Sequence, residues 1–422
     1  MARRPVLRAA LAAALAAILP ACSRGASGEG STASPDPGLV SRDHEIDNEK
    51  LIAWLKGRVD ANPAAGGRER LIAIYTRRGQ MRGRLDDFQA CVTYATQDVD
   101  LTHSAGALES RARCEISLHR FSEAEADLAE AARHFDPAPE ERLALQGDIA
   151  RARGRYEDAL DLYRRAQRGT NAANMARMAS LDAELGDTKG AEALFDAAEA
   201  LLSGHDGALE AWLLTQRAAG EIESGELTTA SERLARARAL DPKNVLAEQY
   251  SAQLLARNGR DGEARALYQS LIAATDNPEY MSRLALLRRK AGDDAGAAAL
   301  VADAKARYQA DLSAFPEALW QHYGQFLLDQ GLDANEAVDV LAKNAASRPS
   351  AASFIPLASA QLAAGDIAGA KATIEKALAT PVKTARLFWT AARVMEAAGE
   401  TERATELRAR ALALNPRVAD LL

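Results

Sequence analysis

The sequence predicts an all-α solenoid of about ten helix pairs, and three observations lead to this fold class. Apolar residues make up 48% of the 422 positions, whereas Phe, Trp and Tyr together make up only 5%. A core so poor in aromatic side chains favours close helix contacts between Ala and Leu, because β-rich domains draw on aromatic and β-branched residues. In addition, one pattern of glycine and alanine recurs along the chain, and a small residue precedes each copy at a fixed distance.

The first 22 residues carry the features of an export signal. Three arginines are followed by an apolar run over residues 9–19, and the segment closes on Leu19-Pro20-Ala21-Cys22. Eleven residues rise only about 16 Å as a helix, which is too short for a bilayer but usual for a signal-peptide core. We therefore expect residues 1–21 to be a cleaved leader.

The end of this leader resembles the bacterial lipoprotein box, with Leu19 three places before Cys22 and Ala21 directly before it. The resemblance implies cleavage before Cys22 and lipid attachment to that cysteine. Ser23, which follows, resembles the signal for the outer membrane in enteric-type sorting. The expected location is the periplasmic face of the outer membrane, and the alternatives are secretion, an inner-membrane lipoprotein or an uncleaved cytoplasmic chain.

A flexible tether is expected between the leader and the folded body. Residues 23–38 consist mainly of Gly, Ser, Ala and Pro and show no apolar periodicity. A flexible stretch of this length spans about 20 to 25 Å. The predicted organisation is a leader at 1–21, a tether at 22–45 and a solenoid at 46–422.

The repeat unit consists of a turn residue, Ala at the fifth following position, an aliphatic or aromatic residue at the ninth and Ala at the twelfth. Gly365 with Ala370, Ile374 and Ala377 is a clear copy. These spacings place the three side chains on one helix face, and the glycine ends the preceding helix where the chain must turn. The predicted turn positions are Gly83, His119, Gly154, Gly186, Gly225, Gly259, Gly292, Gly331, Gly365 and Gly399.

The residue seven positions before most of these turns is small, as at Gly147 and Gly324, so that two antiparallel helices can approach closely. Four prolines are expected to end second helices, because proline disfavours helical backbone in the preceding residue. These are Pro242, Pro278, Pro349 and Pro416.

A period of about 34 residues with small, aromatic and proline positions in this order resembles the tetratricopeptide repeat. The resemblance covers about residues 46–416 and implies a right-handed superhelical solenoid. A helix over 46–60 would cap the N-terminal end of the array. At the other end, Arg408 takes an apolar position of the repeat, which suits a terminal helix that must be solvated.

Cys91 and Cys114 fall on consecutive helices of this register. In an oxidising periplasm the two thiols can form a disulfide. The alternative is that they are two buried, small apolar side chains.

Motifs of enzyme active sites are absent from the sequence. There is no GxxxxGK[ST], HExxH, GxSxG or CxxC, and the six histidines lack metal-ligand spacing. We therefore predict a protein that is not an enzyme and that has no cofactor or metal. The net charge of −7, which becomes more negative once the leader arginines are removed, argues against nucleic-acid binding.

The tetratricopeptide resemblance also implies a concave groove lined by the first helix of each pair. Because Trp and Arg are enriched at binding hot spots, Arg386, Trp389 and Arg393 are the hypothesised anchors for a partner segment. The alternative is that Trp389 fills helix packing and the two arginines are solvated. The candidate groove residues are Trp212, Gln249, Gln253, Gln321, Gln325, Arg386, Trp389 and Arg393.

These features together predict a lipid-anchored periplasmic scaffold that binds proteins and supports assembly of an envelope or secretion complex, with polysaccharide export slightly favoured. One alternative is a glycan-binding module in which Trp212 and Trp389 stack on sugar rings. Another is a cell-wall-active factor without a recognisable catalytic motif.

Overall fold

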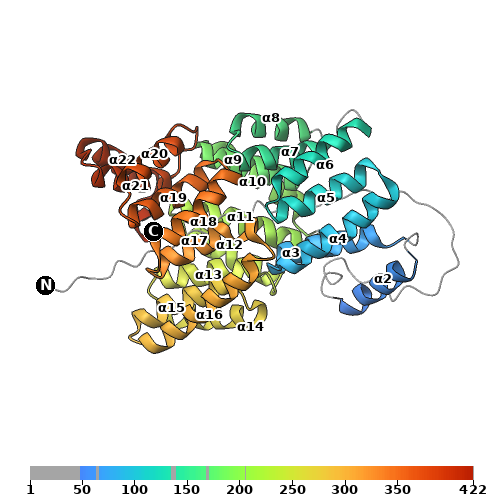
Figure 1. Cartoon of the computed structure of the whole chain (residues 1–422), viewed down its shortest axis with the longest axis horizontal. Helices are drawn as coiled ribbons and strands as arrows, with labels where there is room; N and C mark the ends of the chain where they lie inside the picture. The colour runs from blue at the N-terminus through green and yellow to red at the C-terminus, as the bar shows by residue number, and fades with distance from the viewer. Residues whose placement is uncertain (1–47, 63–65, 135–138, 168–170, 205, 422) are drawn as a thin grey trace.

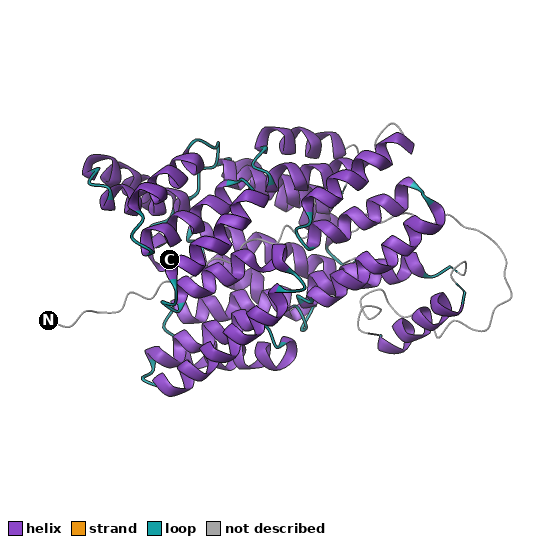
Figure 2. Cartoon of the chain, in the orientation of Figure 1, coloured by secondary structure: helices purple, strands orange, loops and turns teal. Residues whose placement is uncertain are grey.

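The chain folds into helices throughout its described part. The computed structural model describes residues 48–62, 66–134, 139–167, 171–204 and 206–421. These ranges contain twenty-one α-helices and a closing 3-10 helix, and no strand (Figure 2). The all-α prediction is confirmed. The predicted leader (1–21) and tether (22–45) lie outside the described residues.

The helices form ten antiparallel pairs that stack in chain order (Figure 1). Helix α2 (Glu49–Ala61) precedes them where the N-terminal cap was predicted, and η1 (Val418–Leu421) follows them. The pairs are α3 (Arg68–Arg82) with α4 (Leu85–Thr102), α5 (Ala105–Ser117) with α6 (Phe121–His134), α7 (Glu140–Ala152) with α8 (Tyr156–Ala166), α9 (Ala172–Leu185) with α10 (Thr188–Leu202), α11 (Gly207–Ser224) with α12 (Leu227–Leu240), α13 (Val245–Arg257) with α14 (Asp261–Thr275), α15 (Pro278–Lys290) with α16 (Asp294–Leu312), α17 (Pro316–Asp329) with α18 (Ala334–Ser347), α19 (Ala351–Ala363) with α20 (Ile367–Leu378), and α21 (Ala385–Ala397) with α22 (Thr401–Leu414).

The turn between the two helices of every pair has left-handed backbone at the predicted residue. All nine predicted glycines have positive φ, and so does His119, at 58°. Histidine is among the residues that tolerate this region more readily than β-branched side chains do. Each predicted turn is therefore confirmed, including the one without a glycine.

The small residues seven positions before the turns mark close helix contacts. A Cβ atom on Gly147 would lie 2.5 Å from Cε1 of Tyr163, and one on Gly324 would lie 2.5 Å from Cγ of Leu341. Both distances are below normal van der Waals contact, so the helices of these pairs pack at a separation that only glycine permits.

The array winds until its later pairs lie against its earlier ones. The turns of four early pairs meet residues at or just before the start of a first helix five or six pairs later, and the turn between α11 and α12 meets the C-terminal end of α22. We call this row of contacts the seam. Its pairs are Gly83 with Val245, His119 with Glu317, Gly154 with Pro349, Gly186 with Lys383, and Gly225 with Asn415.

Main-chain hydrogen bonds cross the seam. The N–H of Ala351 donates to the Tyr156 hydroxyl at 3.0 Å, and the N–H of Lys383 donates to the carbonyl of Glu184 at 2.8 Å. The side chain of Asn415 donates to the carbonyl of Glu223 at 2.8 Å. Two layers of the solenoid are therefore joined through groups whose positions the backbone fixes.

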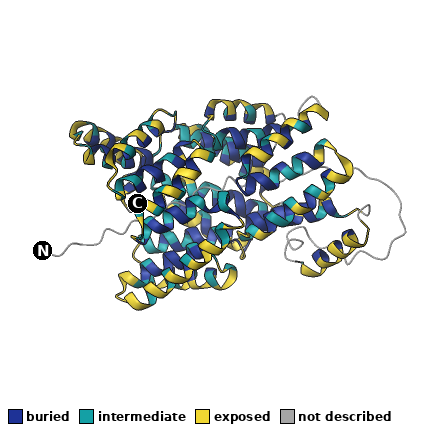
Figure 3. Cartoon of the chain, viewed as in Figure 1, coloured by how far each residue is buried: buried dark blue, intermediate teal, exposed yellow. Residues whose placement is uncertain are grey.

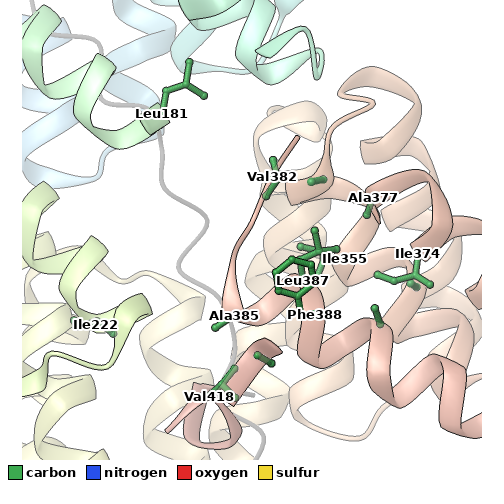
Figure 4. Packing of buried hydrophobic residues seen from close by; sticks show 14 of the residues in the cluster. Leu181, Ile222, Ile355, Ile374, Ala377, Val382, Ala385, Leu387, Phe388 and Val418 are labelled. Carbon is green, nitrogen blue, oxygen red and sulfur yellow. The ribbon is translucent and has the colours of Figure 1, made fainter. Parts of the chain in front are cut away.

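The hydrophobic core extends along the wound array. Buried positions lie between the helices and exposed positions on the outer faces (Figure 3). A large apolar cluster contains Leu181 and Ile222, from α9 and α11, together with Val382, Leu387 and Val418 from the last pairs (Figure 4). Apolar burial therefore continues from the stack of neighbouring repeats across the seam.

Candidate binding cavity between the layers of the solenoid

A partly open cavity of about 610 Å³ lies within the winding. On one side its wall is built from the ends of first helices and the turns of pairs α3 to α12. On the other side it is built from α13, α17, α19, α21 and the segments before α19 and α21. This volume falls in the range of small-molecule sites in proteins. The cavity is therefore a property of the closed array and not of one repeat.

One part of the wall carries a buried and internally paired set of charges. The guanidinium of Arg177 binds both carboxylate oxygens of Asp148 at 3.1 Å, and the Tyr163 hydroxyl donates to the same carboxylate at 2.8 Å. Burial raises the pKa of Asp148, although Arg177 opposes that shift. Nearby, Arg151 pairs with Glu184 at 2.5 Å. These charges satisfy one another and hold successive pairs in place.

A second charged group sits at the seam. Arg386 on α21 donates to Glu223 on α11 at 2.6 Å, and both residues line the cavity. Arg257 also lines the cavity, and its Nη1 is buried without a hydrogen-bond partner among the described residues. Burial lowers the pKa of Arg257 to about 10. The wall therefore includes one guanidinium group, that of Arg257, with a buried nitrogen that no described residue hydrogen-bonds.

Three of the eight candidate groove residues line the cavity, namely Gln253, Gln321 and Arg386. Two of the others are buried: Trp212 packs beside Phe195, and Gln249 hydrogen-bonds to Tyr280 and Glu279. Gln325, Trp389 and Arg393 are partly buried and lie outside the cavity lining.

The three hypothesised anchors differ in their surroundings. Arg386 is held by Glu223 at the seam, whereas Trp389 packs against the large core cluster with the guanidinium of Arg408 6.0 Å from the centre of its ring. Arg393 is partly buried and has a partner of its own. Their role in partner binding stays a prediction.

The two cysteines meet where the repeat register placed them. The structure joins Cys91 of α4 to Cys114 of α5 in a disulfide, with Cα atoms 5.7 Å apart. That distance is usual for such bonds. The link connects the first pair of the array to the second.

Several cavity residues, among them Tyr156, Glu184, Arg257 and Arg348, were absent from the candidates predicted from sequence. The repeat pattern identifies the helix faces that pack within one pair and against the neighbouring pairs. Tyr156, Glu184 and Arg257 make contacts between segments more than 150 positions apart, for which a periodic pattern carries no signal.

Two further observations concern the described residues as a whole. They include no group of three or more His, Cys, Asp and Glu side chains placed to hold a metal ion. None of their helices has the length and apolar character needed to cross a bilayer.

Solved structures that align with this chain do so at low sequence identity. No protein-family model matches the sequence, and no curated protein matches it. A tetratricopeptide repeat protein from Parabacteroides merdae aligns at 20% identity over 60% of this chain and 98% of its own, with a TM-score of 0.36. Yeast Tom70 aligns at 14% identity over 90% and 91% of the two chains, with a TM-score of 0.38. The Cut9–Hcn1 assembly of the APC/C aligns at 12% identity over 90% and 95%, with a TM-score of 0.34.

The assignment of the fold rests on the geometry of this chain itself. Ten helix pairs, a left-handed turn residue in each and small residues at the helix contacts reproduce the repeat that the sequence predicts. The chain is an all-α superhelical solenoid of tetratricopeptide-like helix pairs.

Proposed function

We propose that this protein is a lipid-anchored scaffold on the periplasmic face of the outer membrane, where it binds an envelope protein during assembly of a secretion or export complex. The observation that carries the proposal is the stack of ten helix pairs, since arrays of this kind present extended surfaces for protein partners. Export of a polysaccharide is the favoured setting.

The predicted leader and tether support the location. Lipid attached at Cys22, followed by a flexible segment, keeps the folded array within a thin layer beside the membrane. The effective concentration toward membrane-embedded partners then rises without any new contact. A modest affinity of the array for its partner is sufficient under these conditions.

The arrangement of the tryptophans favours a protein partner over a glycan. A sugar-stacking platform needs an open aromatic face. Trp212 is buried in the packing of α10 and α11, and Trp389 is partly buried with Arg408 near its ring. The glycan-binding alternative therefore has less support than the scaffold.

Membrane attachment is tested with Cys22→Ser in the native host. Wild-type protein is expected in the membrane fraction and labelled by a fatty-acid analogue, whereas the variant is expected to lose the label. An unlabelled wild-type chain would overturn the lipid anchor while leaving the scaffold proposal open.

Partner binding is tested by crosslinking in intact cells followed by mass spectrometry. The combined Trp389→Ala and Arg393→Glu substitutions are expected to remove a specific crosslinked envelope protein. Arg238→Glu, at an exposed position of α12, is the control and should leave the crosslink in place. An unchanged crosslink in the combined variant, with circular dichroism unchanged, would exclude this face as the binding surface.

A further inference from the structure

Arg348 is a cavity residue whose charge the protein does not neutralise. It lies between α18 and α19, and it makes no ion pair with a described residue. Its Nε and Nη2 donate to the amide oxygen of Asn344, and Nη2 also donates to that of Gln321 at 3.1 Å. Burial lowers the pKa of Arg348 to about 10, so the guanidinium still carries its charge at neutral pH.

The neighbouring helix end adds a second source of positive potential. Helix α19 begins at Ala351, and its N-cap residue Ser350 makes no side-chain capping bond. The N–H of Ala352 in the first turn makes no hydrogen bond with a described residue. Ser350, Ala351, Ala352 and Arg348 all line the cavity. A helix N-terminus of this kind attracts anions through its free N–H groups and its dipole.

A buried amide beside Arg348 is also short of a partner. Gln321 is 4% exposed and lines the same part of the cavity. Its oxygen accepts from Arg348 and Asn344, whereas its Nε2 has no hydrogen-bond partner among the described residues. An unsatisfied buried donor is costly, so a ligand that accepts from it would be favoured.

None of the six acidic side chains that line the described part of the cavity forms an ion pair with Arg348. Asp148 is bound by Arg177, Glu184 by Arg151, and Glu223 by Arg386. His119, which also lines the cavity, is buried, and this burial lowers its pKa so that it stays neutral. No side chain of the described wall therefore supplies the negative charge that Arg348 lacks.

We propose that the cavity binds a small oxyanion, a phosphate or carboxylate group, at the N-terminus of α19, where Arg348, the N–H of Ala352 and the amide of Gln321 recognise it. The group belongs to a small molecule, because the cavity volume of about 610 Å³ suits a ligand of that size. The site adjoins the seam contact of Gly154 with Pro349, so bound ligand also holds the two layers of the solenoid together. This inference is independent of the partner that the scaffold binds.

The test is isothermal titration calorimetry of the purified full chain with inorganic phosphate and, separately, with citrate at matched ionic strength. We expect one site, and we expect Arg348→Gln to weaken it by about tenfold or more, because a charge-assisted pair of hydrogen bonds is lost. Arg238→Gln, an exposed arginine of α12 outside the cavity, is the matched control and should bind as the wild type does. Binding of phosphate alone identifies a phosphoryl ligand, and binding of citrate alone a carboxylate; either supports the site.

Two results would overturn the proposal. One is the absence of binding by the wild type with both anions, and the other is equal affinity of wild type and Arg348→Gln. If Arg348→Gln does not fold, Arg348→Lys keeps the charge and loses the planar fork. The anion is then expected to raise the unfolding temperature of the wild type more than that of Arg348→Lys, and equal increases would exclude the site.

Discussion

At the scale of single residues, Glu115 on α5 is the clearest case of a charge that the fold disfavours. Its side chain is 8% exposed, and its Oε2 has no hydrogen-bond partner among the described residues. Burial, with a smaller contribution from Asp127, raises the pKa of Glu115 to about 8, against the opposing effect of Arg111. The folded protein therefore holds a proton on Glu115 at neutral pH.

This shift predicts how stability depends on pH. A carboxyl whose pKa is higher in the folded than in the unfolded state stabilises the fold at low pH, and that contribution is lost as pH rises from the unfolded value of about 4.5 through about 8. Replacing Glu115 with Gln removes the titration. We expect the free energy of unfolding of Glu115→Gln to exceed that of the wild type by about 1 to 3 kcal/mol at pH 9.

Urea unfolding between pH 5 and pH 9 measures this difference. Glu157→Gln, at an exposed position of α8, is the control and should parallel the wild type. A constant difference between Glu115→Gln and wild type across the range would contradict the prediction.

The cysteine pair yields a second prediction at this scale. Cys91 and Cys114 are 23 positions apart, and a crosslink closing such a loop stabilises by about 3 kcal/mol when its effect is mainly on the unfolded chain. In a Cys22→Ser background, reductant is expected to lower the unfolding temperature. The same protein with both cysteines replaced by serine should not respond.

A thiol titration of the denatured, unreduced Cys22→Ser protein provides the direct check. We expect no free thiol after periplasmic expression. Two free thiols per chain would show that the residues are buried, small side chains without a bond.

At the scale of elements, the sequence predicts the helix pairs because the residues that determine each pair lie close together in the chain. A glycine at Gly365 and an apolar face at Ala370, Ile374 and Ala377 describe one turn and one helix without reference to the rest of the chain. His119 was predicted as a turn from its position in the repeat alone, and its φ of 58° agrees. Prolines 242, 349 and 416 each follow the end of a second helix by two residues.

Close packing within a pair can be tested at Gly324. An added Cβ there would lie 2.5 Å from Cγ of Leu341, so we expect Gly324→Ala to lower the free energy of unfolding by about 1 to 3 kcal/mol through overpacking. The matched control is Gly220→Ala, inside α11, where no atom lies within 4 Å of the added Cβ. That variant should be neutral or stabilised by up to about 1 kcal/mol.

Chemical denaturation of the two variants under identical conditions measures the two changes in the free energy of unfolding. Equal effects of the two substitutions would mean that backbone entropy, and not the distance between α17 and α18, governs the position.

At the scale of the whole molecule, the sequence does not predict the seam or the cavity. The partners at the seam, such as Tyr156 with Ala351, are 195 positions apart, and the contact depends on the accumulated rotation of six helix pairs. Small changes in the packing angle of each pair add up over that distance. The candidate groove residues lie on first helices of their pairs, but the sequence does not predict the closure that buries Arg386 beside Glu223.

Closure of the array predicts a change of shape in Gly154→Ala. The added Cβ would overlap the carbonyl oxygen of Pro349 across the seam, and the residue would also have to keep a φ of 73°. Gly365→Ala has a comparable φ of 83° but no atom within 4 Å of the added Cβ, so it isolates the cost of the backbone conformation. We expect a larger radius of gyration for Gly154→Ala than for Gly365→Ala in small-angle X-ray scattering.

Identical scattering curves for the two variants would indicate that the layers separate and rejoin freely in solution. A difference confined to Gly154→Ala would show that the seam holds the solenoid closed.

The seam also limits how this protein can evolve. In an open array each repeat touches its neighbours alone, so single copies can be gained or lost at little cost. Here Gly154 must face Pro349 and Gly186 must face Lys383, with a fixed number of helix pairs between the partners. Deleting or duplicating one internal copy would set every later contact one unit out of register, so we expect such changes to open the seam.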